Sequence, residues 1–178
     1  MLTGVDILDP EGRSTAPFEP GEIVLRGNLV SPRYYRDNEA TAEVKRDGWH
    51  HTGDVGHRDQ DGFIYIVDRK KDMIVSGGFN VYSAEVEKII LSHPGVRECA
   101  VIGVPDDKWG EAVKAIVEPN TNVQLDSAEI IALCKAKLGG VKAPKSVEIW
   151  DELPRSANGK VLKRKVRDQF WLERRRAV

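Results

Sequence analysis

The first 70 or so residues alternate between hydrophobic and polar positions over short stretches, with turn-forming residues between them. This alternation is typical of half-buried β-strands, and it predicts strands over Gly4–Leu8 and Gly21–Arg26. Residues 56–67 predict a β-hairpin that closes on an Asp-Gln-Asp-Gly turn. A short helix is expected over Asn38–Val44, with Asn38 as its cap. This part of the chain is therefore predicted to be rich in β-structure.

In the second part of the chain, helical and strand-like patterns alternate. Hydrophobic residues recur at helical spacing over 86–90, which predicts a helix that Ser83 caps and that the Pro-Gly pair at 94–95 ends. Residues 98–104 and 112–118 are rich in β-branched residues and predict two strands.

A second helix is predicted to begin at Asp126, because Glu129 follows three residues later in a pattern similar to a capping box. The Gly-Gly pair at 139–140 is expected to end this helix. Residues 146–150 predict a third strand. Three hydrophobic positions spaced by four residues from Leu162 onwards predict an amphipathic helix near the carboxy terminus.

Together these elements predict an α+β fold in two parts. Residues 1–68 form a β-rich piece, and residues 69–178 form a small mixed sheet with flanking helices. The boundary falls within the charged segment 68–72. Because the first piece is small for an independent hydrophobic core, we expect it to be the end of a larger domain.

The composition is that of a soluble globular protein, with 40% hydrophobic and 31% charged residues. The 27 basic and 28 acidic residues nearly balance, which excludes a histone-like binder of nucleic acid. No hydrophobic run approaches the ~20 residues of a membrane span, and the amino terminus is not of the signal- or transit-peptide type. Cys99 and Cys134 lack metal-ligand spacing, so we expect buried thiols in a reducing cytoplasm.

Positive charge is concentrated near the carboxy terminus, where residues 160–178 contain eight basic and two acidic residues. A basic segment of this kind can bind nucleic acid or another polyanion. The helical spacing of its hydrophobic residues instead favours an amphipathic helix with a solvated basic face. We therefore expect no nucleic-acid partner.

Four short segments carry residues that suit ligand chemistry. In the first, Gly53 lets a ligand approach the backbone closely, and the Asp54 carboxylate can accept both hydroxyls of a ribose. The alternative is a loop in which Asp54 caps its own backbone. The adjacent His50 and His51 have no third ligand close by in the sequence, so we predict no metal site.

The other three segments contain charged residues or glycines. The cluster at 68–72 is either a hinge or a solvated linker. Gly77 and Gly78 allow a ligand or partner to approach the backbone, although the Lys-Ser/Thr of a phosphate-binding P-loop is absent. Trp109 lies in a polar loop, which indicates an interface, a ligand wall or packing at the domain edge. Lys160, in a loop with Pro and Gly, is either solvated or suited to a phosphate or oxyanion.

Taken in order, these segments resemble the carboxy-terminal part of the AMP-forming acyl-CoA synthetases, a family of adenylate-forming enzymes. The resemblance runs from about Val5 to Phe170. It rests on an ordered set of stretches: 48–55 (GWHHTGDV), 68–87 (DRKKDMIVSGGFNVYSAEVE), 93–96 (HPGV) and 153–160 (LPRSANGK). The resemblance implies a two-step reaction. ATP and a carboxylic acid give an acyl-adenylate and pyrophosphate, and coenzyme A (CoA) then displaces AMP.

The resemblance also implies roles for single residues. Asp54 matches the carboxylate that holds the ribose of ATP or AMP, and Arg69 matches the arginine that assists it. Lys71 matches the hinge about which the carboxy-terminal domain rotates between the half-reactions. Lys160 matches the catalytic lysine that bridges an ATP phosphate and the substrate carboxylate, where its charge offsets the negative charge of the reacting groups.

A further set of residues matches positions that contact CoA in the family: Gly77, Gly78, Trp109, Lys142 and Lys145. The two glycines match a loop beside the pantetheine tunnel, and the tryptophan matches one near the same tunnel. Relatives often carry an aromatic residue and sometimes an arginine where this chain has Val141 and Ala143. These two side chains cannot stack on a base or pair with a phosphate, so the two lysines remain as contacts for the CoA nucleotide.

The family's ATP loop and acid-binding pocket lie in an amino-terminal domain, of which residues 1–67 resemble the last subdomain. We therefore expect that domain to bind most of ATP and Mg²⁺, and we expect this chain alone to be inactive. The alternatives are an adenylation domain that loads a carrier protein, and a non-catalytic interaction module. An uncovered surface on residues 1–67 is expected to favour self-association.

Overall fold

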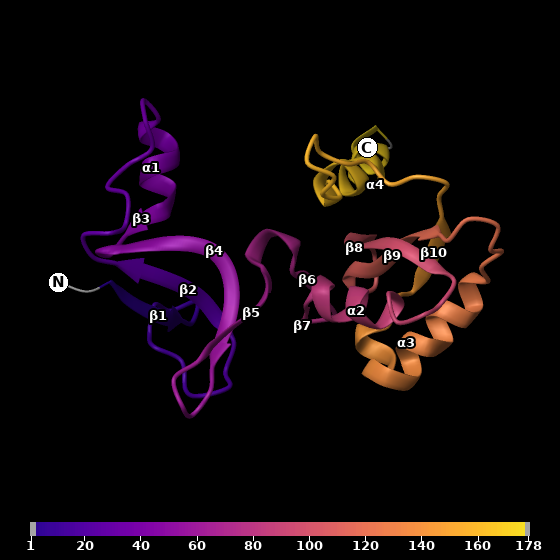
Figure 1. Ribbon diagram of the computed structural model, residues 1–178, viewed down its shortest axis with the longest axis horizontal. Coiled ribbons are helices and arrows are strands. Elements are labelled where there is room, and N and C mark those ends of the chain that lie inside the picture. The colour runs from indigo at the N-terminus through magenta and orange to yellow at the C-terminus, as the bar shows by residue number, and fades with distance from the viewer. Residues whose placement is uncertain (1–2, 177–178) are drawn as a thin grey trace. The chain divides into compact units, whose positions relative to one another are not determined.

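The computed structural model describes residues 3–176, and its contacts divide the chain into two compact units (Figure 1). Unit 1 ends at Lys71, and unit 2 begins at Asp72. The division therefore falls three residues after the boundary expected from the sequence.

The described part of unit 1 contains a five-stranded antiparallel sheet and a short helix. Its strands are β1 (Gly4–Leu8), β2 (Gly21–Arg26), β3 (Lys45–Arg46), β4 (Trp49–Arg58) and β5 (Ile64–Arg69). Strands β1, β2, β4 and β3 are adjacent in that order, and β5 pairs with β4 in the predicted hairpin. The buried hydrophobic residues of this unit are Ile7, Leu8, Ile23, Val24 and Val55.

Helix α1 (Asn38–Val44) has the predicted bounds but a different cap. The carboxylate of Asp37 accepts a hydrogen bond from the backbone N–H of Ala40 at 2.9 Å. The prediction that Asn38 is the cap was therefore wrong by one residue. The backbone of Asp37 is still non-helical, which is the conformation that a capping residue requires.

Unit 2 contains the predicted mixed sheet. Its strands are β6 (Ile74–Ser76), β7 (Phe79–Val81), β8 (Val96–Asp106), β9 (Gly110–Pro119) and β10 (Ser146–Ile149). Strands β8 and β9 form a long antiparallel hairpin, and β10 runs parallel to β9. Strands β6 and β7 form a short hairpin, which joins the sheet because β6 pairs with β9.

Helices cover both faces of this sheet (Figure 1). Helices α2 (Ser83–Ile90) and α3 (Ser127–Lys142) pack on the face that carries Val101 and Val113. Helix α4 (Lys163–Arg176) packs on the opposite face through Val166, against residues such as Ile116. The two faces arise because successive side chains of a strand point to opposite sides.

The helix starts in unit 2 confirm one predicted cap and correct another. The Asp126 carboxylate accepts a hydrogen bond from the N–H of Ala128, as predicted. Tyr82, rather than Ser83, is the N-cap residue of α2, and it makes no side-chain capping bond. Ser83 is buried, and its hydroxyl accepts a hydrogen bond from the Lys163 ammonium at 2.9 Å, a partner 80 residues away.

Gly139 ends the regular part of α3, as predicted from the Gly-Gly pair, and a short turn follows to Lys142. Cys99 and Cys134 are buried free thiols, and burial raises the pKa of both. Among the described helices, none has the length and apolar character required to cross a membrane.

Candidate functional site

In unit 1, strand pairing brings together two residues that the sequence singled out. Asp54 on β4 lies opposite Arg69 on β5, and Arg69 Nε is 3.4 Å from Asp54 Oδ1. The Thr52 hydroxyl donates to the Ile23 carbonyl and accepts from the N–H of Asp54. The hydroxyl thus bonds the backbone of Asp54, and the carboxylate is left for Arg69.

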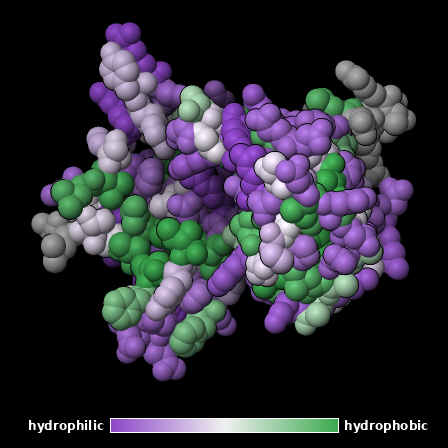
Figure 2. Space-filling view, turned by 45° about the vertical axis from the view of Figure 1, so that its right-hand side comes forward, coloured by the Kyte–Doolittle hydropathy of each residue, from purple (hydrophilic) through white to green (hydrophobic). Residues whose placement is uncertain are grey.

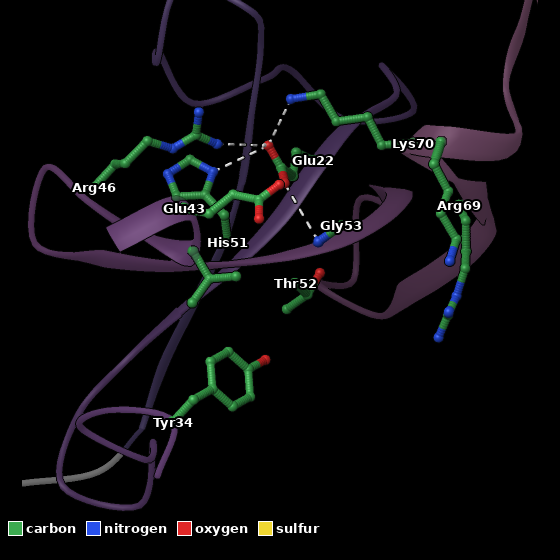
Figure 3. Close-up of a pocket in the computed structure, with 11 residues that line it drawn as sticks. Glu22, Tyr34, Glu43, Arg46, His51, Thr52, Gly53, Arg69 and Lys70 are labelled. Carbon is green, nitrogen blue, oxygen red and sulfur yellow. Dashed lines mark hydrogen bonds and ion pairs between the residues drawn. The ribbon is translucent and has the colours of Figure 1, made fainter. Parts of the chain in front are cut away.

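A cleft with a volume of about 620 Å³ opens beside this pair in unit 1 (Figure 3). It is lined by Glu22, Tyr34, Glu43, Val44, Arg46, His51, Thr52, Gly53, Arg69, Lys70 and Lys71. The lining comes from β2, α1, β3, β4 and β5, from the segment before α1 and from the turn after β5. Four cationic side chains against two carboxylates give the cleft a net positive charge.

Glu22 is the centre of a polar network in this cleft that the sequence analysis missed (Figure 3). Its Oε2 lies 3.0 Å from His51 Nδ1 and accepts a hydrogen bond from Lys70 Nζ at 2.9 Å. Its Oε1 accepts a hydrogen bond from the N–H of Gly53, next to Asp54. Burial raises the pKa of Glu22, but the bonds from Lys70 and His51 outweigh burial and hold it below its usual value. Glu22 therefore ties the strand that carries Asp54 to the turn after β5.

That turn is a short 3₁₀-helix over Lys70–Asp72, and it contains Lys71. The division between the two units falls directly after Lys71. Lys70, one residue earlier, is fixed to unit 1 through Glu22.

In unit 2, the β6–β7 turn contains two glycines, of which Gly77 lies against Trp109. Gly77 and Gly78 both have positive φ angles, of 58° and 82°. The N–H of Gly77 donates to the carbonyl of Trp109 at 2.9 Å, and a Cβ atom on Gly77 would lie only 2.5 Å from Trp109 Cε3. Glycine is required here because the indole ring occupies the space of a side chain.

Trp109 lies in the β8–β9 turn, where the Asp106 carboxylate accepts a hydrogen bond from the backbone N–H of Trp109. The Trp109 side chain is partly exposed. Two lysine ammonium groups lie over its ring, Lys108 at 4.8 Å and Lys145 at 5.7 Å from the centroid. Gly77, Trp109 and Lys145 therefore form one cluster. Lys142 differs, because its ammonium is held by the Glu85 carboxylate at 2.8 and 2.9 Å.

Lys160 lies in an exposed turn between β10 and α4. Among the described residues, its ammonium group has no hydrogen bond or ion pair. Of the two residues that flank Lys142, Val141 is exposed and Ala143 is fully buried. Within residues 3–176, no three His, Cys, Asp or Glu side chains gather closely enough to hold a metal ion.

The family profile described as the AMP-binding enzyme C-terminal domain matches residues 85–160. A feruloyl-CoA synthase from Amycolatopsis sp. is 51% identical over 170 residues, which are 96% of this chain and 35% of the relative. The chain is the carboxy-terminal part of a member of the AMP-forming acyl-CoA synthetase family. A medium/long-chain fatty-acid–CoA ligase of Mycobacterium tuberculosis is 45% identical and is matched over all of this chain and 32% of its own length.

Solved structures share the fold of this chain. ATP-bound MatB from Rhodopseudomonas palustris superimposes with a TM-score of 0.87 at 38% identity, over 94% of this chain and 34% of that chain. The o-succinylbenzoate–CoA synthetase of Bacillus subtilis, in complex with its acyl-adenylate intermediate, gives 0.85 at 37% identity, over 93% and 34%. This chain thus spans about a third of the length of the synthetases that it matches.

Proposed function

We propose that this chain supplies the carboxy-terminal part of an enzyme that joins a carboxylic acid to CoA at the expense of ATP. The observation that carries the proposal is the Asp54–Arg69 pair at 3.4 Å directly before Lys71, in a chain 51% identical to a feruloyl-CoA synthase. In the first step, a carboxylate oxygen of the acid attacks the α-phosphorus of ATP and pyrophosphate leaves. In the second step, the CoA thiol loses its proton to solvent and its sulfur attacks the acyl carbon; the bond from that carbon to the phosphate oxygen breaks, and AMP leaves.

In this proposal, unit 1 holds the nucleotide. The Asp54 carboxylate accepts hydrogen bonds from the ribose hydroxyls, and Arg69 fixes the orientation of that carboxylate. Lys71 is the hinge between the half-reactions. Lys160 approaches the reacting phosphate and carboxylate, where an ammonium group without a competing partner stabilises the developing negative charge.

Unit 2 provides the proposed CoA contacts. Gly78 faces open space and leaves room for the pantetheine arm, and Gly77 lets the Trp109 ring pack against the turn and form a wall beside that arm. Lys145 is free to turn toward a phosphate of the nucleotide, since within the described part of the chain its ammonium group contacts only the Gly140 carbonyl and the Trp109 ring. Lys142 contacts the CoA nucleotide only after its ammonium group separates from the Glu85 carboxylate.

The reaction needs Mg²⁺ to balance the charge of ATP, but the described residues do not offer a matching donor set. We therefore assign Mg²⁺, the phosphate loop and the acid pocket to the amino-terminal part of the enzyme. Figure 2 shows hydrophobic residues on the surface of unit 1, and Phe18, Phe63 and Ile66 are all strongly exposed. We propose that the amino-terminal part covers this surface, and that the isolated chain self-associates through it.

The proposal is tested with the chain alone and with a chimera. The chimera joins the amino-terminal two-thirds of the Amycolatopsis feruloyl-CoA synthase to this chain ahead of β1. Acid-dependent ATP–pyrophosphate exchange is measured with ferulate and a panel of fatty acids, followed by thioester formation with CoA. We expect no exchange by the chain alone and clear exchange by the chimera.

Lys160→Ala is expected to reduce exchange by the chimera by about 100-fold or more, which is typical for loss of one group that stabilises transition-state charge. Lys165→Ala is the matched control, because Lys165 is also an exposed lysine of the same region. Equal exchange by the two variants would refute the role of Lys160. Exchange by the chain alone would refute the division of labour, and transfer to a carrier protein but not to CoA would favour a carrier-loading domain.

A further inference from the structure

Strand β9 contains a carboxylate in the interior of unit 2. Glu118 is 1% exposed and lies on the sheet face that also carries Ile116 and packs against α4. A buried carboxylate is costly unless nearby groups compensate its charge and fill its hydrogen-bonding capacity. The partners of Glu118 therefore indicate what this carboxylate holds in place.

One oxygen of Glu118 faces the sheet and the other faces the loop that carries Lys160. Oε1 pairs with Arg97 Nη1 at 3.0 Å, on the neighbouring strand β8. Oε2 accepts two hydrogen bonds, from the N–H of Leu153 at 3.0 Å and from Arg155 Nη2 at 3.1 Å. Both of these donors lie in the segment that leads from β10 to Lys160.

Arg155 continues the connection to the end of the loop. While Nη2 binds Glu118, Nη1 donates to the carbonyl of Gly159 at 3.2 Å, one residue before Lys160. The planar guanidinium group thus links a buried carboxylate to the backbone of the turn in a fixed geometry, which a lysine could not reproduce. Glu98 also approaches Arg155, but at 3.7 Å and from a more exposed position.

The turn itself is closed by short backbone bonds. The N–H of Ser156 donates to the carbonyl of Lys160 at 2.8 Å, and the N–H of Gly159 donates to the carbonyl of Ser156 at 2.9 Å. The N–H of Lys160 donates to the Ser156 hydroxyl. The Lys160 ammonium has no hydrogen bond or ion pair among the described residues. The position of the Lys160 side chain on unit 2 therefore depends on the backbone of the turn.

We infer that Glu118 is a positioning residue, which holds the Lys160 turn at a fixed place on unit 2 through Arg155. The inference rests on the proposed function for the role of Lys160. Small displacements of a reacting group have large effects on rate, because the bound geometry must lie close to that of the transition state. Glu118 itself lies in the interior of unit 2 and is not among the residues proposed to contact a reactant.

The first test measures backbone protection in the chain itself, by hydrogen exchange with mass spectrometry. The peptide 156–162 contains the N–H groups of the closed turn. In Glu118→Gln we expect this peptide to exchange about 10-fold faster or more, with peptides from α2 and α3 unchanged. Arg97→Gln is the matched control, because it removes the other partner of Glu118 but does not contact the turn.

If Glu118→Gln accelerates exchange throughout unit 2, the carboxylate serves the whole unit and not the turn, and Arg155→Gln then decides the question. Arg155 is partly exposed, so its loss is expected to leave the fold intact and to release only the turn. Unchanged exchange of 156–162 in Arg155→Gln overturns the inference.

The second test separates this inference from the proposed function. In the chimera, Glu118→Gln is expected to lower the turnover number for pyrophosphate exchange about 10-fold, with little change in the KM for ATP. In a Lys160→Ala background, Glu118→Gln should cause no further loss, because both changes act through the same side chain. A further loss would overturn the inference. If the turn is released in Glu118→Gln but Lys160→Ala has full activity, the proposed role of Lys160 is wrong while the anchoring of the turn stands.

Discussion

Unit 1 and unit 2 place their candidate site residues by different physical means. In unit 1, two paired strands bring Asp54 and Arg69 together, and a charged network around Glu22 holds the adjacent turn. In unit 2, hydrophobic clusters on both faces of a sheet fix the helices, and the candidate residues lie in turns attached to that framework. The site in unit 1 should therefore respond to charge and pH, and the glycine turn of unit 2 to side-chain volume and backbone conformation.

The groups with shifted pKa values follow this difference with one exception, Glu148 of unit 2, whose pKa is lowered by a hydrogen bond from Lys114. Asp6, Glu22 and Asp59 of unit 1 all have pKa values below their usual range, although burial alone would raise them. Hydrogen bonds to the ionised carboxylates outweigh burial in each case. In unit 2, the buried thiols of Cys99 and Cys134 have raised pKa values because of burial.

The largest expected effect comes from the core of unit 2. Ile90→Ala removes a fully buried side chain from α2 and should lower the free energy of unfolding of unit 2 by about 2–5 kcal/mol. Ile66→Ala in unit 1 is the control, since this isoleucine is 70% exposed and its truncation should cost less than about 0.5 kcal/mol. Unfolding in urea measures the loss of stability, and hydrogen exchange in peptides of each unit shows in which unit the loss occurs. Similar losses in the two variants would contradict the contrast between the units.

A second prediction concerns the glycine turn of unit 2. Gly77→Ala and Gly78→Ala both place a side chain at positive φ, which costs about 1–2 kcal/mol in each case. Gly77→Ala also forces a Cβ atom against the Trp109 ring, and should cost about 1–3 kcal/mol more than Gly78→Ala, which meets open space. Urea unfolding measures the difference. Trp109→Ala should remove the additional cost, and equal losses in the two alanine variants would show that the ring yields freely.

A third prediction concerns the network in unit 1. Glu22→Gln leaves Lys70 and His51 without their shared carboxylate, and should lower the free energy of unfolding by about 1–2 kcal/mol at neutral pH. Because the folded-state pKa of Glu22 is below its unfolded value, the ionised carboxylate stabilises unit 1 above the unfolded pKa. This stabilisation is lost as the pH falls through the lowered pKa.

The difference between the wild type and Glu22→Gln should therefore shrink in acid, which urea unfolding at a series of pH values measures. Glu43→Gln is the control, because Glu43 lines the same cleft without a hydrogen bond or ion pair among the described residues. A difference that stays constant from neutral to acidic pH would show that the charge of Glu22 is not what stabilises the unit.

Sequence patterns were enough to predict the helices and strands that depend on interactions between residues close together in the chain. The β4–β5 hairpin, the long strands of unit 2 and the terminal helix follow from turn residues and periodicity. The strands β3, β6 and β7 were missed, because two or three residues are too short to show a period. Ser83 was misread as a cap because its actual partner, Lys163, lies 80 residues away in the sequence.

The same limit applies to the candidate sites. Asp54, Arg69 and Lys160 carry motif signals, so the sequence could name them. Glu22 and Glu118 carry none, because each is a single carboxylate in a hydrophobic strand. The partners that make them important lie 29 and 48 residues away for Glu22, and 35 and 37 residues away for Glu118. Only the folded chain brings these groups together.

The smallest expected effect is the difference in stability lost when each of two Asp helix caps is removed. Asp126 caps α3, which buries Ile130, whereas Asp37 caps α1, in which no residue is buried. Asp126→Ala should therefore lower the free energy of unfolding of unit 2 by about 1 kcal/mol, because α3 must stay ordered to cover the sheet. Asp37→Ala should fray α1 and speed hydrogen exchange at Ala40 with little loss in global unfolding, since no packed surface depends on that helix.

Asparagine also accepts a hydrogen bond at an N-cap, so Asp126→Asn should restore most of the stability that Asp126→Ala loses. Urea unfolding of the three variants measures these differences, and exchange at Ala40 and Ala128 reports each cap directly. An equal global loss in Asp37→Ala and Asp126→Ala would mean that α1 supports unit 1 as firmly as α3 supports unit 2. The contrast between unit 1, held by strand pairing and charge, and unit 2, held by packed helices, would then not apply to the helices.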